Sequence, residues 1–164
     1  MATAATEILF TDVPVLTHRS LIDEELWERV VNRMLSDYKH MKGMNRALAE
    51  RCLNEALGYL QLCAIADKCY SPAPLVDLAW HTLIVYTYHY RELCTRIAGR
   101  FIDHEPFDVP DVDYGDLSAK PSETMTAMVA NGIAVDTPEL WNGAADCCQN
   151  KYGRWCCQHR DKCG

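Results

Sequence analysis

Hydrophobic residues recur at helical spacing along the first part of the chain. Residues 20–39 form the first predicted helix, because acidic side chains fill its first turn and apolar side chains follow at positions 26, 30 and 34. A second helix is predicted over residues 45–66, after the break at Gly43. Each pattern places its apolar side chains on one face, so both helices are expected to pack against a common core.

The middle of the chain predicts a third, longer helix. Pro72 and Pro74 mark a turn, since each proline keeps the residue before it out of the helical conformation. The apolar pattern then runs from residue 74 or 75 to residue 98, with Gly99 as the expected stop. Residues 101–121 are rich in aspartate and proline, and they predict an irregular acidic connection.

Two shorter helices are expected towards the end. Ser122 is the predicted cap of one, which the Asn131-Gly132 pair ends. Thr137 is the predicted cap of the other, with a proline at its first helical position. Only the short stretches "EILF" and "GIAV" suggest extended chain. The sequence therefore predicts an all-α fold of about five helices.

The predicted helices divide the chain into three parts. Residues 1–19 form an N-terminal arm, residues 20–142 a single compact helical domain, and residues 143–164 a cysteine-rich tail. A chain of 164 residues in which 49% are hydrophobic is long enough and apolar enough to bury a core of its own. We therefore expect one globular domain.

Charge and the N-terminal sequence narrow the classes of function. A formal charge of −7 argues against a protein that coats nucleic acid, because phosphate binding needs clustered lysine and arginine. We find no secretory signal pattern and no apolar run that predicts a membrane span, so we expect a cytoplasmic protein. In a reducing compartment, the nine cysteines favour thiols or thiolate ligands over disulfides.

A carboxylate and an imidazole lie one helical turn apart in the third predicted helix. Asp77 and His81 share one face, together with Val85 and Tyr88, and His104 follows the helix by a short connection that could fold back. Imidazole and carboxylate ligands together suit zinc or another divalent first-row metal. The alternative is an Asp77 that accepts a hydrogen bond from His81 and fixes its orientation without a metal.

The same stretch resembles a family. Residues 71–106 are similar to a segment of bacterial proteins in the largely uncharacterised group called glycine-rich domain-containing protein-like. The resemblance implies a helical domain and specifies little about function. Leu83 stands where plant relatives carry a second histidine, and the glycine-rich region is missing. The matching positions are Asp77, Trp80, His81, Tyr90, Cys94, Gly99, Phe101, Ile102, His104 and Pro106.

The tail concentrates sulfur in a polar segment. Five cysteines and a histidine occur in the last eighteen residues, too many thiols for so little apolar sequence to bury. They could form a zinc site or, because the spacing matches no standard finger, a copper(I) or multi-zinc thiolate cluster. The alternatives are reversible disulfides, a substrate tail for a modifying enzyme, and incidental cysteines. The candidate ligands are Cys147, Cys148, Cys156, Cys157, His159 and Cys163.

The other four cysteines, Cys52, Cys63, Cys69 and Cys94, are expected to pack as small apolar side chains. Three hypotheses for function follow. The first is a helical binding module with a thiolate metal site in its tail, and the second is a thiol-redox protein or modified substrate, with an unknown protein partner or modifying enzyme. The third is a metalloenzyme centred on Asp77, His81 and His104, for which the sequence identifies no catalytic residue.

Overall fold

The computed structural model describes residues 13–104 and 120–142. Within these residues it contains α-helices, one short 3₁₀ helix and no β-strand, which confirms the all-α prediction. The elements are η1 (Arg19–Leu21), α1 (Glu24–Asp37), α2 (Arg46–Ile65), α3 (Pro74–Ile84), α4 (Thr87–Ala98), α5 (Pro121–Ala130) and α6 (Glu139–Asn142).

The first two long helices begin at side-chain caps. Asp23 accepts a hydrogen bond from the Leu26 amide (2.8 Å), and Asn45 accepts one from the Leu48 amide (2.9 Å). Each cap satisfies an amide that has no partner inside its own helix. α1 therefore starts four residues later than the predicted residue 20, and the preceding residues form η1.

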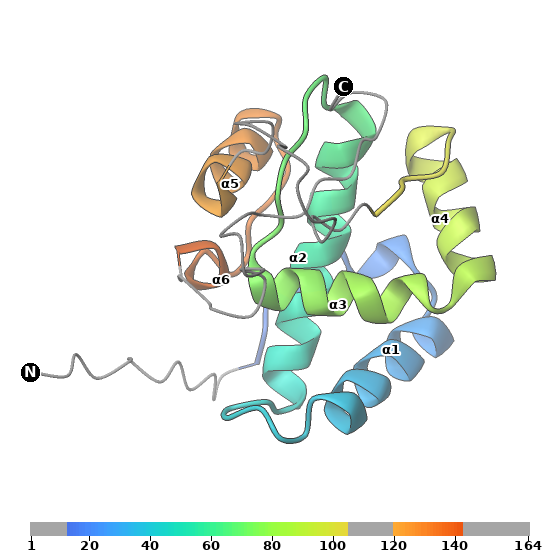
Figure 1. Cartoon of the computed structure of the whole chain (residues 1–164), viewed down its shortest axis with the longest axis vertical. Coiled ribbons are helices and arrows are strands. Elements are labelled where there is room, and N and C mark those ends of the chain that lie inside the picture. Colours follow the sequence, from blue (N-terminus) through green and yellow to red (C-terminus); the bar gives the residue numbers. More distant parts are fainter. Residues whose placement is uncertain (1–12, 105–119, 143–164) are drawn as a thin grey trace, which may run out of the picture.

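Helix α2 lies at the centre of the molecule (Figure 1). It contacts α1, α3, α4 and α5, so buried residues occur all around its surface rather than along one stripe. Large aromatic side chains fill the core around it, and their burial removes extensive apolar surface from water. The fully buried aromatic residues are Trp27, Tyr59, Trp80, Tyr90 and Trp141.

The third predicted helix is in fact two helices. α3 ends at Ile84, and Tyr86 takes a non-helical conformation (φ −83°, ψ 60°) before α4 begins. The Tyr86 hydroxyl donates to the Arg29 carbonyl (3.2 Å), and the Arg29 guanidinium lies over the Tyr86 ring. The prediction of one helical face from Asp77 to Tyr88 is therefore wrong, since a contact with α1 accompanies the break and α4 leaves in another direction (Figure 1).

Glycines end two helices as predicted. Gly99 and Gly132 both have positive φ (67° and 73°), a conformation that other residues adopt only with strain. The start of α5 differs from the prediction, because Lys120 is its N-cap and Ser122 lies inside its first turn.

The short helix α6 begins near the predicted position, but not by the predicted side-chain cap. The Thr137 carbonyl accepts a hydrogen bond from the Leu140 amide (3.1 Å), whereas the buried Thr137 hydroxyl has no hydrogen-bond partner among the described residues. Residues 132–135, "GIAV", lie between α5 and α6 and form no strand.

A buried carboxylate on α2 holds this last segment. Glu55 is fully buried and accepts hydrogen bonds from the amides of Asp136 and Thr137 (2.9 Å each) and from Trp141 Nε1 (2.8 Å). Burial raises the pKa of Glu55, and the three donors partly offset that effect. Glu55 thus fixes α6 to the core.

A buried histidine ties the N-terminal residues to the same region. The Gln61 side-chain NH₂ donates to His18 Nδ1 (2.8 Å), and His18 Nε2 donates to the Ala134 carbonyl (2.9 Å). Because a carbonyl only accepts, Nε2 carries the proton and Nδ1 is the acceptor. The His18 amide also donates to Asn54 Oδ1 (2.8 Å), so both ring nitrogens and the backbone are satisfied.

The stretch "EILF", the connection at 105–119 and every candidate ligand in the tail lie outside the described residues. No helix in the part of the chain that the structure describes is both long enough and apolar enough to cross a membrane.

Candidate metal centre

The structure brings Asp77, His81 and His104 together. Asp77 and His81 project from successive turns of α3, and the segment after α4 returns towards α2 and α3 (Figure 1). His104, at the end of this segment, thereby reaches the other two side chains. The three side chains differ in exposure: 1% for Asp77, 10% for His104 and 43% for His81.

Both imidazoles turn the same nitrogen inwards. The Nε2 atoms of His81 and His104 lie 2.7 Å apart. His104 Nε2 lies 3.1 Å from Asp77 Oδ1, and His81 Nε2 lies 3.5 Å from Asp77 Oδ2. One potential ligand atom from each residue therefore falls within 4.8 Å of the others.

The electrostatic environment favours a neutral imidazole at His81. Burial lowers the pKa of His81, Asp77 acts in the opposite direction, and the neighbouring His104 lowers the pKa further. A neutral imidazole has the free lone pair that a metal ligand needs. The buried Asp77 supplies negative charge beside it.

Trp80 forms one wall of the site. Its ring centroid lies 4.4 Å from that of His104, with the two planes inclined by 59°, and its side chain is fully buried. Trp80 and His81 are neighbours on α3, so the helix places an apolar wall and a ligand side by side. The dry wall strengthens the interaction of Asp77 with any cation at the site.

Three cysteines in the described residues are buried and keep their thiols outside any disulfide, as predicted: Cys52, Cys63 and Cys94. Burial raises the pKa of Cys63 and Cys94, which keeps both as thiols. Cys69 is also buried, but it is disulfide-bonded. The prediction of a free packing thiol at Cys69 is therefore wrong.

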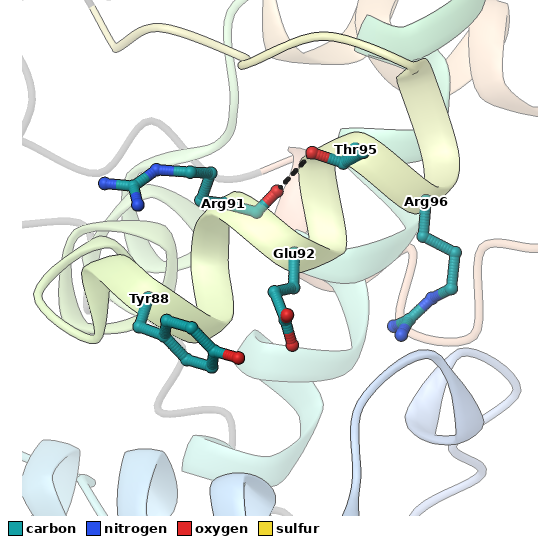
Figure 2. Close-up of a pocket in the computed structure, with 5 residues that line it drawn as sticks. All are labelled: Tyr88, Arg91, Glu92, Thr95 and Arg96. Carbon is teal, nitrogen blue, oxygen red and sulfur yellow. Dashed lines mark hydrogen bonds between the residues drawn. The ribbon is translucent and has the colours of Figure 1, made fainter.

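A separate cavity of about 470 Å³ lies against α4. Figure 2 shows Tyr88, Glu92 and Arg96 on one side of the helix, and the Thr95 hydroxyl donating to the Arg91 carbonyl (2.9 Å). A hydrogen bond with Glu92 raises the pKa of Tyr88, and Arg96 donates to the Leu21 carbonyl. The residues of the candidate metal centre, Asp77, His81 and His104, do not line this cavity. The sequence did not predict the cavity.

Comparison with known proteins places the chain in a family. A family model described as UCP032817-like matches residues 17–113, which is more than half of the chain. The chain belongs to the UCP032817-like family. The UCP032817-like region contains Asp77, His81 and His104, and it ends before the cysteine-rich tail. The match does not bear on the resemblance to the glycine-rich domain-containing group, which stays a prediction.

No curated protein and no solved structure matches the chain. The function of the UCP032817-like region must therefore be argued from its own residues.

Proposed function

We propose that this protein is a metal-binding helical domain in which Asp77, His81 and His104 hold a divalent first-row cation such as zinc. The observation that carries the proposal is the convergence of two Nε2 atoms and a buried carboxylate oxygen within 4.8 Å. Two imidazoles and one carboxylate form a ligand set that zinc and non-haem iron(II) both accept.

The distances fit a site that opens slightly to admit the ion. Two nitrogens bound to one tetrahedral zinc are about 3.3 Å apart, given bonds of about 2.0 Å. The present 2.7 Å separation of the Nε2 atoms requires a shift of about 0.6 Å. His81 can supply this movement, because 43% of its side chain is exposed. The hydrogen between the two Nε2 atoms would have to leave before both bind the cation, either to solvent or to Nδ1 of its own ring.

Three protein ligands leave at least one coordination position for water or another small ligand. That arrangement is typical of catalytic and exchangeable metal sites, whereas structural zinc sites have four protein ligands. The partial exposure of His81 gives solvent a route to this position. An enzyme activity at the site follows as a hypothesis, with a metal-bound water as the reactive group.

A second metal site in the tail is an independent proposal. Its support is compositional: Cys147, Cys148, Cys156, Cys157 and Cys163 with His159 crowd a polar segment. Thiolates favour zinc or copper(I), and a reversible disulfide or an enzymatic modification of the same cysteines is the alternative. The two proposals need experiments that keep them apart.

Zinc titration by isothermal calorimetry under reducing conditions tests the first proposal. We expect one equivalent of zinc to be lost in each of His81→Ala and His104→Ala, and to be retained in His89→Ala, a matched histidine on α4. Retention of full stoichiometry in both site variants would contradict the Asp/His centre.

The same titration also tests the proposed site in the cysteine-rich tail. The full-length double variant Cys156→Ala/Cys157→Ala should lose any thiolate-bound metal and keep the metal of the Asp/His centre. Unchanged stoichiometry in this variant would contradict a tail site that uses these two cysteines.

A further inference from the structure

We propose that Tyr90 is a positioning residue, whose hydroxyl holds His104 in place beside Asp77 and His81. This inference rests on the proposed metal centre for its significance. Tyr90 contacts none of the three ligand atoms in the described interactions and acts through the backbone of the segment that carries His104.

The argument begins with a buried relay of hydrogen bonds. Trp80 Nε1 donates to the Tyr90 hydroxyl (2.9 Å), and the Tyr90 hydroxyl donates to the Ile102 carbonyl (2.7 Å). An indole N–H only donates and a carbonyl only accepts, so both directions are fixed. All three residues are fully buried.

The segment that carries His104 needs such an attachment. Residues 101–104 follow the left-handed Gly99 and belong to no helix or strand, so no regular backbone ladder holds them. Tyr90 contacts this segment twice. Its hydroxyl bonds the Ile102 carbonyl, and its ring meets Phe101 edge-on at 5.3 Å between centroids.

The same hydrogen bonds connect α3 with the segment that carries His104. Trp80, the donor at its start, packs against the His104 ring, while Ile102 lies two residues before His104 in the chain. The relay therefore fixes the distance between α3, which carries Asp77 and His81, and the segment that carries the third ligand. Burial raises the pKa of Tyr90, so its proton remains available to the Ile102 carbonyl across the physiological range.

Tyr90→Phe removes the hydroxyl and keeps the ring. We expect zinc affinity to fall on the order of 10-fold, the size of effect seen when a group that orients a ligand is lost. Tyr59→Phe is the matched control, because Tyr59 is an equally buried tyrosine that also packs on Trp80, but its hydroxyl donates to the Tyr70 carbonyl instead of the His104 segment. Its zinc affinity should stay within about 2-fold of the wild type.

A double-mutant cycle separates positioning from general destabilisation. His104→Ala loses the tightly bound equivalent of zinc, and in that background Tyr90→Phe should not change the weak affinity that Asp77 and His81 retain at high zinc concentration, because the ligand that Tyr90 positions is already gone. An equal further loss in that background, or an equal loss in Tyr59→Phe, would overturn the proposal.

A metal-free measurement distinguishes this inference from the proposed function. The Trp80 ring should shift the ring protons of His104 in the NMR spectrum, and Tyr90→Phe should reduce that shift while Tyr59→Phe preserves it. If the wild type binds no zinc, the proposed function fails, and the His104 shift still decides the role of Tyr90. A His104 shift unchanged in Tyr90→Phe would refute the positioning role.

Discussion

Two buried carboxylates on neighbouring helices have different surroundings. Glu55 on α2 accepts hydrogen bonds from two backbone amides and one indole, none of which changes its charge near neutral pH. Asp77 on α3 faces the Nε2 atoms of two imidazoles, a type of side chain that can carry a proton or bind a metal ion through its nitrogen. Similar burial thus leads to different chemistry.

The histidines near each carboxylate differ in the same way. Both ring nitrogens of His18 have a partner, because Nε2 donates to the Ala134 carbonyl and Nδ1 accepts from the Gln61 amide. His81 and His104 instead direct equivalent nitrogens at each other and at Asp77. A fully satisfied network stabilises a fold, whereas imidazole nitrogens and a carboxylate that converge form a candidate site for a cation.

The largest effect is expected from breaking the structural network. Glu55→Ala leaves two buried donors and one partly buried donor without an acceptor, and it should lower the free energy of unfolding by about 3–5 kcal/mol. Urea denaturation followed by circular dichroism measures this loss. Glu139→Ala, an exposed glutamate on α6, is the control and should change stability by about 0.5 kcal/mol or less.

For zinc affinity, a change at Asp77 should have a larger effect than the same change at Glu55. Asp77→Asn keeps the shape of the side chain but removes its charge, and zinc affinity should fall by about 100-fold or more. Glu55→Gln, the same change at the structural carboxylate, should leave the zinc affinity of the folded protein within about 2-fold of the wild type. Equal losses in both variants, measured by calorimetry, would remove the distinction between the two sites.

Much of the helical architecture could be predicted because its signals are local. The predicted start of the second helix at Asn45 is the cap of α2, and Gly99 ends α4 as predicted, whereas α1 begins after the Asp23 cap rather than at residue 20. The break before α4 lacks such a signal. No glycine or proline stands at residues 85–86, and Tyr86 bonds Arg29, which is 57 positions away in the chain. Tertiary contacts of this kind override local helix preference.

Local sequence signals likewise predict only part of the candidate site. The spacing of Asp77 and His81 follows directly from one turn of a helix. The position of His104 does not, because it depends on the break at Tyr86, on the direction of α4, and on a segment without regular structure. The hydrogen bonds of Tyr90 were not predicted either. Its partners Trp80 and Ile102 come close to it only because the chain changes direction at Tyr86 and again after Gly99.

A close approach between η1 and α2 gives a third, smaller test of the structural network. A methyl group at Gly58 would lie 2.7 Å from His18 Nε2 and 3.0 Å from the Met128 side chain. Gly58→Ala should therefore disturb the hydrogen bond from His18 to Ala134. The net destabilisation should be about 1–2 kcal/mol, after about 1 kcal/mol is regained from the helix preference of alanine.

The contact with His18 can be isolated by a second substitution. In a His18→Ala background, thermal unfolding should show little further cost of Gly58→Ala, because the clashing ring is absent. A full additional cost in that background would show that Met128 or the backbone, rather than His18, limits the space at Gly58.

The smallest expected effect is a pH dependence confined to the Asp77 cluster. The pKa of His81 is lower in the folded protein than the value of about 6.5 in an unfolded chain. As pH falls below about 6.5, the unfolded chain therefore takes up this proton first, and stability drops until the pH passes the folded pKa.

Urea unfolding of the metal-free protein between pH 5 and 8 should show a shallow decline on the acidic side. The decline should be reduced in His81→Ala and kept in His89→Ala, and an identical profile in all three proteins would refute it. The drop should stay small because His81 is partly exposed, and added zinc should enlarge it, since the ion binds only the folded, deprotonated site.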